Sequence, residues 1–295
     1  MKISIFANPS KSLALKMVDE LLPWLKERVE VLNVHLSNEE PFDPGDADTC
    51  IVFGGDGTML TCARRLTRYD VPIVGVNVGR LGFLAGVNPS SFKREFERIL
   101  DGKYRIIERM MLEVDGLEQQ QLQGDSSDMV VLNELVLERG GSPRTLSIDV
   151  FHGEEYFNTF SADGVIVSTP TGSTAYSLSA GGPLVAATLE VMIISPICPH
   201  CLYERPFIIA ADMPVRLQLQ EFYEDALVVL DGQRVFRSSD KVNIEIRKAK
   251  NNLKMLTPTD VGQYEVIRSK LNWGCPFIPV ENSVRPTPPK MDKRK

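Results

Sequence analysis

Two stretches of the sequence combine residue types that suit phosphate and sugar chemistry. The first, Gly54-Gly55-Asp56-Gly57-Thr58, follows the apolar run Cys50–Phe53 and precedes a helical pattern that starts at Met59. Glycines permit a tight turn, and the following helix presents unpaired N–H groups and a positive dipole end to an anion. We therefore interpret this turn as a phosphate-binding elbow in which Gly54, Gly55 and Thr58 face phosphate.

The carboxylate of Asp56 separates this elbow from a simple anion cradle. A negative charge beside phosphates needs a compensating role, either as proton acceptor or as partner of a divalent metal. The alternative is a helix N-cap, a common role of an Asp before a helix. The turn is neither a P-loop nor a dinucleotide fingerprint, whose third glycine position holds Leu60. On the helix that follows, Arg64 is a candidate phosphate contact, with a solvated helix face as the alternative.

The second stretch runs from Asp163 through a short strand into a segment rich in hydroxyls, small residues and glycine that ends at Pro183. Residues 164–183 include no charged side chain, which is unusual for a plain surface loop of this length. Many small donors with little bulk suit ribose hydroxyls, amides and phosphates. The alternative is a Ser/Thr-rich loop with ordinary turn chemistry.

Short apolar runs alternate with helical patterns in the first third of the chain, which predicts parallel strands joined by helical crossovers. We expect a three-layer, Rossmann-like α/β domain of the phosphofructokinase kind over residues 1–104. The predicted strands are Ile3–Phe6, Glu30–Val34, Cys50–Phe53 and Pro72–Val76, and the predicted helices are Leu13–Val29, Met59–Arg68 and Phe92–Leu100.

From residue 105 the pattern changes to strands separated by turn residues, which indicates an antiparallel, sandwich-like β domain over residues 105–256. Residues 257–278 are expected to return to the first domain, and residues 279–295, rich in proline and basic residues, to be a disordered tail. The predicted strands of the second domain are Arg109–Val114, Val130–Glu138, Leu146–Phe151, Gly164–Ser168, Phe207–Ala210, Val215–Leu219, Ala226–Leu230 and Lys241–Ile246.

Composition excludes several classes of protein. The 295 residues are 43% hydrophobic and 24% charged, which argues against intrinsic disorder, and no apolar run is long enough to span a membrane. A formal net charge of -6 argues against nucleic acid as the main partner. Five cysteines without framework spacing, and a start that reads as a strand rather than a leader, predict a cytoplasmic protein.

Taken together, the two stretches and several later blocks resemble the NAD kinase family. The elbow alone is also similar to turns of diacylglycerol, sphingosine and phosphofructokinase families, whereas the Asp163–Pro183 run is far more specific. The resemblance extends from Ile3 to Gly274, and its further blocks are Gly75–Leu84, Asn133-Glu134, Pro199-His200, Arg205-Pro206, Asp231-Gly232-Gln233 and Lys270–Gly274. The chain departs from the family pattern at Ser161 and at several positions between Cys198 and Arg205.

This resemblance implies phosphoryl transfer from ATP, another nucleoside triphosphate or polyphosphate to the 2′-hydroxyl of the adenosine ribose of NAD. A divalent metal, usually Mg²⁺, would assist, and no metal site built from protein side chains is expected. The protein would be a homodimer or homotetramer. The alternatives are a lipid kinase of the diacylglycerol or sphingosine type and a non-catalytic NAD-sensing protein of the same fold.

The resemblance also implies roles for individual residues. Asp56 would be the general base, and Asn133 and Glu134 would hold the adenosine portion of NAD. Asp163 would contact the other nucleoside. The remaining substrate-binding residues implied are Gly57, Phe83, Thr171, Thr174, Ala175, Tyr176, Ser179, His200 and Gln233.

Overall fold

The computed structural model describes residues 1–37, 42–79, 82–84, 86–117, 120–123, 129–238, 241–258 and 263–271. Met1–Val261 form one compact unit. The other unit, Gly262–Lys295, contains the helix α5 (Gln263–Leu271), which is described by itself. The predicted tail, the end of the predicted return segment, and Arg80 and Leu81 lie outside the described residues.

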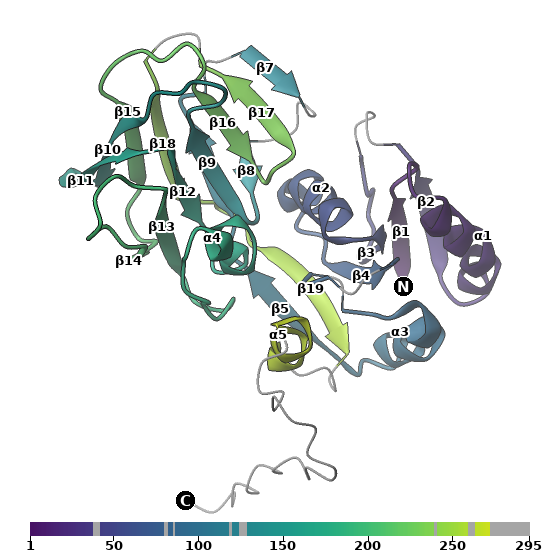
Figure 1. Ribbon diagram of the computed structural model, residues 1–295. Coiled ribbons are helices and arrows are strands. Elements are labelled where there is room, and N and C mark those ends of the chain that lie inside the picture. The colour runs from purple at the N-terminus through teal and green to yellow at the C-terminus, as the bar shows by residue number, and fades with distance from the viewer. Residues whose placement is uncertain are drawn as a thin grey trace, which may run out of the picture. The chain divides into compact units, whose positions relative to one another are not determined.

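A six-stranded sheet forms the N-terminal part of the first unit (Figure 1). Its strand order is β2-β1-β3-β4-β19-β5, with neighbouring strands parallel except for β5, which runs antiparallel to β19. All six residues of β3 are buried, as expected for a central strand covered on both faces. The bounds are β1 (Lys2–Ala7), β2 (Glu30–His35), β3 (Thr49–Gly54), β4 (Ile73–Asn77), β5 (Tyr104–Arg109) and β19 (Leu253–Pro258).

Helices cover both faces of this sheet. Helix α1 (Ser12–Lys26) and α3 (Phe92–Leu100) share one hydrophobic cluster with one face, while α2 (Asp56–Leu66) shares another with the opposite face. Helix α1 buries Ala14, Met17, Val18, Leu21 and Leu25, a spacing that places one apolar stripe against the strands. The three-layer α/β prediction is confirmed.

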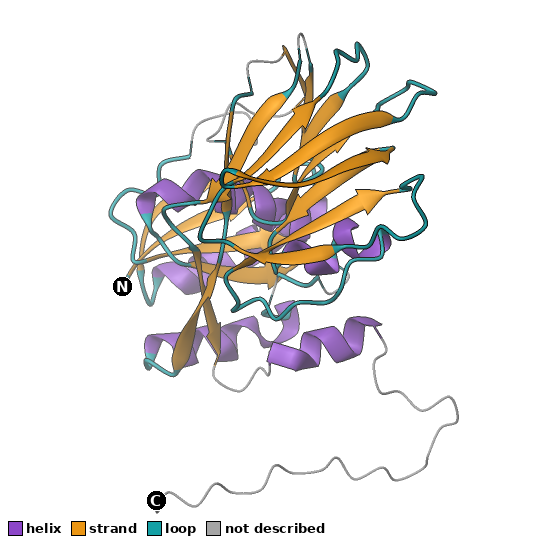
Figure 2. Ribbon diagram, turned by 90° about the vertical axis from the view of Figure 1, so that its left-hand side faces the viewer, coloured by secondary structure: helices purple, strands orange, loops and turns teal. Residues whose placement is uncertain are grey.

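Two antiparallel sheets face each other in the middle of the chain, and Figure 2 shows this region to consist mainly of strands and loops. One has the order β11-β10-β15-β18-β6-β8, and the other β14-β13-β12-β9-β16-β17-β7. Alternate residues of both sheets meet in one core, so the predicted β-rich sandwich is confirmed. The bounds are β6 (Leu112–Asp115), β7 (Gln120–Gln123), β8 (Val130–Val131), β9 (Glu134–Glu138), β10 (Leu146–His152), β11 (Glu155–Ala162), β12 (Gly164–Ser168), β13 (Val191–Ile197), β14 (Phe207–Ala210), β15 (Val215–Leu219), β16 (Leu227–Leu230), β17 (Arg234–Arg237) and β18 (Asn243–Lys248).

Short helical turns complete the first unit: η1 (Thr67–Tyr69), η2 (Pro89–Ser91), η3 (Gly172–Thr174) and α4 (Tyr176–Ser179). Among the helices of the described residues, none combines the length and apolar character needed to cross a membrane.

Several expected strands differ from the observed ones. The predicted strand Arg109–Val114 corresponds to β6 from Leu112 onward, but its start is wrong, because Arg109 ends β5 in the first sheet and β6 begins at Leu112 in the sandwich. The predicted strand Val130–Glu138 is interrupted at Leu132 and Asn133, because their amides donate to the buried Asp231 carboxylate instead of continuing the ladder. A continuous apolar run does not reveal such a change of sheet or partner. The strands absent from the expectation are β5, apart from its last residue, β7, β11, β13, β17 and β19.

The first sheet includes β5 and β19, so sheet membership assigns residues 104–109 and 253–258 to it. Strand β19 lies between β4 and β5 and pairs with both. After β4 the chain therefore adds β5 at the edge of the first sheet, leaves it to build the sandwich, and returns to it through β19.

Candidate functional site

The glycine elbow joins β3 to α2. Gly54 ends the strand, Gly55 is the N-cap of the helix, and Asp56 is the first helical residue. A Cβ on Gly54 would lie 2.3 Å from the Thr58 side chain, so only glycine fits there. Because Gly55 occupies the capping position, the alternative of Asp56 as N-cap is wrong, and its carboxylate is directed elsewhere.

Two backbone amides from the loop after β4 hold the Asp56 carboxylate. The Phe83 N–H donates to Oδ2 at 2.9 Å, and the Leu84 N–H donates to Oδ1 at 3.1 Å. A Cβ on Gly82 would stand 1.9 Å from Oδ1, so this loop passes directly against the carboxylate. These contacts fix the orientation of Asp56 and leave each oxygen a further lone pair for a ligand.

A hairpin of the sandwich reaches α2 through Gln233. The turn between β16 and β17 contains Asp231 and Gly232, both with positive φ, and presents the Gln233 side chain to the helix. The Gln233 side-chain amide donates through Nε2 to the Gly57 carbonyl at 2.8 Å, and its Oε1 accepts a hydrogen bond from the Arg64 guanidinium at 2.6 Å. Gln233 therefore links the sandwich to the start of α2.

The Arg64 guanidinium is only 2% exposed. Besides its bond to Gln233, its positive charge stabilises the Asp231 carboxylate. Arg64 thus connects α2 to the turn that carries Asp231 and Gln233. The assignment of Arg64 as a phosphate contact stays a prediction.

Asp231 organises the Asn133-Glu134 pair. Its buried carboxylate accepts hydrogen bonds from the amides of Leu132 (3.0 Å), Asn133 (2.8 Å) and Glu134 (3.2 Å). Burial raises the pKa of Asp231, while these amides and Arg64 act in the opposite direction. The three amide bonds hold Asn133, which is half-buried, in the gap between β8 and β9.

The Glu134 carboxyl is 5% exposed, and its Oε2 has no hydrogen-bond partner among the described residues. Burial, with a smaller contribution from the Asp231 charge, raises its pKa from 4.5 to about 8, although the Tyr176 amide bonded to it opposes the shift. This shift favours the protonated form of the carboxyl at neutral pH. The carboxyl is therefore a buried donor that a ligand hydroxyl or carbonyl could satisfy.

The hydroxyl-rich segment packs directly on Asn133. Thr169 donates twice, through its amide to the Asn133 carbonyl at 2.8 Å and through its hydroxyl to the Leu132 carbonyl at 2.6 Å. A Cβ on Gly172 would stand 2.3 Å from the Asn133 carbonyl oxygen. The segment therefore needs a glycine at this close approach.

The predicted pocket residues of this segment differ in exposure. Thr171 is buried, and its hydroxyl has no hydrogen-bond partner among the residues that the structure describes; Thr174 donates to the Thr171 carbonyl at 3.1 Å. Ala175 is half-buried, whereas Tyr176 and Ser179 are exposed. Burial raises the pKa of the Tyr176 hydroxyl, with smaller effects of the Glu138, Cys198 and Asp163 charges.

Asp163 and His200 lie at the other end of the β9–β12 pair from Glu134. In the antiparallel register Ser168 faces Glu134 and Gly164 faces Glu138. Four residue steps at about 3.3 Å each separate the two ends, roughly 13 Å. Asp163 forms an ion pair with Arg139 at 2.8 Å, and the exposed His200 donates its amide to the Ser161 carbonyl at 2.9 Å.

Hydrogen bonds thus connect the elbow, the Asn133-Glu134 pair and the hydroxyl-rich segment into one region. His200 belongs to the opposite end of the strand pair, where its amide donates to the Ser161 carbonyl. Asp231 was not among the predicted site residues, although the Asp-Gly-Gln block that contains it is typical of a turn. Arg139 was not predicted either, because its ion pair with Asp163 depends on the pairing of β9 with β12.

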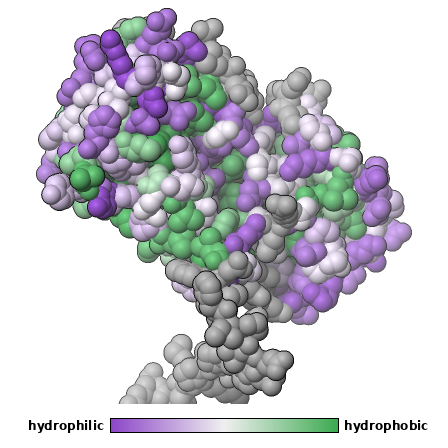
Figure 3. Space-filling model, viewed as in Figure 1, coloured by the Kyte–Doolittle hydropathy of each residue, from purple (hydrophilic) through white to green (hydrophobic). Residues whose placement is uncertain are grey.

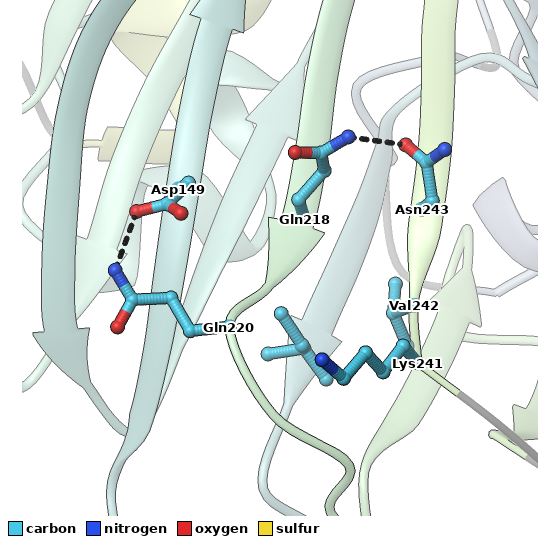
Figure 4. A pocket seen from close by; sticks show the side chains of 7 residues that line it. Asp149, Gln218, Gln220, Lys241, Val242 and Asn243 are labelled. Carbon is cyan, nitrogen blue, oxygen red and sulfur yellow. Dashed lines mark hydrogen bonds between the residues drawn. The ribbon is translucent and has the colours of Figure 1, made fainter.

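A separate hollow of about 420 Å³ opens on the sheet that contains β10, β15 and β18 (Figure 4). Its polar side chains already pair with one another: Gln218 donates to Asn243 at 3.1 Å, and Gln220 to Asp149 at 3.0 Å. No predicted site residue lines it.

Within the described ranges, no three His, Cys, Asp or Glu side chains are grouped to hold a metal.

Comparison with known proteins gives consistent matches over both parts of the chain. Residues 35–104 match the family model of the ATP-NAD kinase N-terminal domain, and residues 132–257 match that of the C-terminal domain. A protein named NAD kinase from Geotalea daltonii is 37% identical over 287 residues, covering 92% of this chain and 99% of its own length. An NAD kinase from Clostridium botulinum is 35% identical over 280 residues, covering 92% and 96%.

Two solved structures have a similar fold. A yeast NADH kinase complexed with NADH superposes with a TM-score of 0.79 at 22% identity, covering 95% of this chain and 90% of that one. An NAD kinase from Archaeoglobus fulgidus in complex with ATP gives a TM-score of 0.74 at 25% identity, covering 92% and 99%.

Proposed function

Because this chain belongs to the NAD kinase family, we propose that it transfers a phosphoryl group to the 2′-hydroxyl of the adenosine ribose of NAD. The main support from its own residues is Asp56. A carboxylate fixed by the Phe83 and Leu84 amides stands at the N-terminus of α2, where phosphates bind favourably. A proton acceptor beside an anion site is what phosphorylation of a hydroxyl requires.

The two ends of the β9–β12 pair support the binding of a dinucleotide. Asn133 and Glu134 lie at the end connected to the elbow, and Asp163 lies at the other. We assign the adenosine half of NAD to the first end and the second nucleoside to the other. Glu134, whose protonated form is favoured at neutral pH, would donate to a sugar or base oxygen, and Tyr176 would cover the exposed side of the pocket.

In this mechanism Asp56 accepts the proton of the 2′-hydroxyl while the sugar oxygen bonds to the terminal phosphorus of the donor. The bond from that phosphorus to the bridging oxygen breaks, and the shortened donor leaves. The α2 N–H groups and the glycine backbone orient the phosphates, since alignment and charge stabilisation supply most of such catalysis. Either ATP or polyphosphate provides the same phosphoanhydride bond, so we propose both as donors.

A divalent ion, Mg²⁺ in our proposal, fits the residues present. Mg²⁺ is usually bound through one or two carboxylates together with substrate phosphates rather than by a cage of protein ligands. Asp56 is the carboxylate that would face such an ion, with the donor phosphates supplying the other oxygens. When bound, the ion would neutralise phosphate charge.

One assay tests the proposed function. NAD or NADH is supplied with ATP or polyphosphate, with and without Mg²⁺, and the position of the new phosphate is identified by NMR. We expect NADP from NAD, and Asp56→Asn should lower kcat about 100-fold or more while changing the dissociation constant of NAD little. Binding of NAD without product would instead indicate the non-catalytic alternative, and phosphorylation of a lipid alone would indicate the lipid-kinase alternative.

The homodimer or homotetramer is also part of the proposal. Strand β14 ends its sheet, and its Phe207 and Ile208 are 50% and 42% exposed. The preceding segment exposes Leu202 and Tyr203, and Figure 3 shows apolar side chains at the surface of the sandwich. An end strand with exposed apolar residues favours association, which sedimentation equilibrium would measure.

A reduced, cytoplasmic compartment is proposed from the cysteines. Cys50, Cys62, Cys198 and Cys201 are free, and the last two are exposed. Exposed thiols that remain unpaired are typical of proteins that work in a reducing compartment. Localisation of the tagged protein by fractionation would test this assignment.

A further inference from the structure

Lys11 lies at the same sheet edge as the glycine elbow. Strand β1 ends at Ala7, and a turn closed by the Lys11 amide donating to the Asn8 carbonyl at 3.1 Å leads into α1. Strands β1 and β3 are parallel neighbours in which Ala7 pairs with Phe53. The turn after β1 and the elbow after β3 therefore emerge side by side at the carboxyl ends of these strands.

The Lys11 ammonium rests against the elbow itself. A Cβ placed on Gly55 would be 3.2 Å from the Lys11 Nζ, so a larger residue there would meet the ammonium. Lys11 has no carboxylate partner within the described part of the chain, whereas Lys2, Lys248 and Lys254 each form an ion pair. The positive charge at the elbow is thus left for a ligand.

Two buried oxygen atoms beside the elbow independently indicate a ligand. Thr58 is 3% exposed, and a Cβ placed on Gly54 would stand 2.3 Å from the Thr58 Oγ1. Asn77, 4% exposed, is paired in register with Gly54 on the neighbouring strand. Neither the Thr58 Oγ1 nor the Asn77 Oδ1 has a hydrogen-bond partner among the described residues. Buried polar atoms without partners are rare in native proteins, so a bound group is expected here.

We infer that Lys11 binds the phosphates of the phosphoryl donor. This inference rests on the proposed function and names one residue of its donor site. An ammonium is a compact charge suited to phosphate oxygens, and its flexible stem allows it to follow charge that moves to the leaving phosphate as the phosphoanhydride bond breaks. Because ATP and polyphosphate share that phosphate chain, Lys11 serves either donor and does not contact NAD.

The test compares Lys11→Ala and Lys11→Arg with Lys16→Ala, a control that removes an exposed lysine from α1. The KM for ATP is measured at saturating NAD, the KM for NAD at saturating ATP, and the binding of inorganic tripolyphosphate by calorimetry. We expect Lys11→Ala to raise the KM for ATP and weaken tripolyphosphate binding about tenfold or more. The KM for NAD and the melting temperature should stay near the wild-type values, and Lys11→Arg should restore most of the donor affinity.

An unchanged KM for ATP in Lys11→Ala, or an equal rise in the control, would overturn the assignment of Lys11 while leaving the proposed function intact. A rise in the KM for NAD alone would also overturn it. Wild-type protein that forms no NADP with any donor would reject the proposed function instead. In that event the comparison of tripolyphosphate binding between wild type and Lys11→Ala still decides whether Lys11 binds phosphate.

Discussion

Replacement of Glu134 by Gln should make the unfolding free energy of the ligand-free protein less dependent on pH. In the folded protein, burial beside Asp231 raises the Glu134 pKa from 4.5 to about 8. The folded state therefore holds this proton more tightly than the unfolded state. The stability contribution is fully present below pH 4.5, decreases as the pH rises, and is lost once the pH passes about 8.

The magnitude follows from the two pKa values. Each pH unit between them costs about 1.4 kcal/mol of unfolding free energy, so the whole effect approaches about 5 kcal/mol. Between pH 5 and pH 7 the wild type should lose about 2.5 kcal/mol through this group alone. Gln has a similar shape and no proton to release. Between pH 5 and pH 7 the unfolding free energy of Glu134→Gln should therefore rise by about 2.5 kcal/mol relative to that of the wild type.

Urea unfolding followed by circular dichroism at intervals from pH 5 to pH 9 measures this difference, with Glu154→Gln as the matched control. Glu154 is an exposed carboxylate in the turn between β10 and β11, so its replacement should leave the wild-type pH profile in place. A stability difference between Glu134→Gln and wild type that does not change with pH would refute the reasoning, as would one that decreases from pH 5 to pH 7. A carbon-13 NMR titration of the Glu134 carboxyl provides a second reading, with a midpoint expected near pH 8.

Two further substitutions test how the elbow is held. Gly82→Ala would put a Cβ 1.9 Å from the Asp56 Oδ1 and should lower kcat about 100-fold by displacing the carboxylate. Gly86→Ala, with open space at its Cβ, is the control, and equal kcat values for the two variants would contradict the geometry. Gln233→Ala removes the bond to the Gly57 carbonyl and a partner of a buried guanidinium, so urea unfolding should show a loss of about 1–3 kcal/mol. Gln218→Ala, on the sandwich surface, should change stability by less than about 0.5 kcal/mol, and a similar value for Gln233→Ala would reject the proposed link.

The elements of the first domain could be predicted because their sequence patterns are local. Helix α3 begins and ends at Phe92 and Leu100, as predicted, and the fully apolar Cys50–Phe53 run is the centre of β3. The glycines of the elbow also signal a turn through their own conformational freedom. The same reasoning missed β5 and extended the predicted strand of β6 back to Arg109, because hydrophobic periodicity does not show which sheet a residue joins.

The roles of individual site residues depended on partners far away in the sequence. Asp56 is oriented by amides 27 and 28 positions later, and Gln233 reaches Gly57 across 176 positions. No local pattern encodes such contacts. The sequence predicted Gln233 as a pocket residue, which stays a prediction, but it did not reveal that the Gln233 side chain also supports α2 through its hydrogen bonds to Gly57 and Arg64.

The sequence by itself determined the fold class, the family and the residue types available for phosphate chemistry, because these follow from periodicity and from contiguous motifs. Only the tertiary structure decided that the Glu134 carboxyl is buried and where the Lys11 ammonium lies. Glu134 holds its proton because folding removes it from water and sets it beside Asp231, and Lys11 faces Gly55 because β1 and β3 are neighbours in the sheet. Both properties arise from burial and proximity, which exist only after distant segments have packed together.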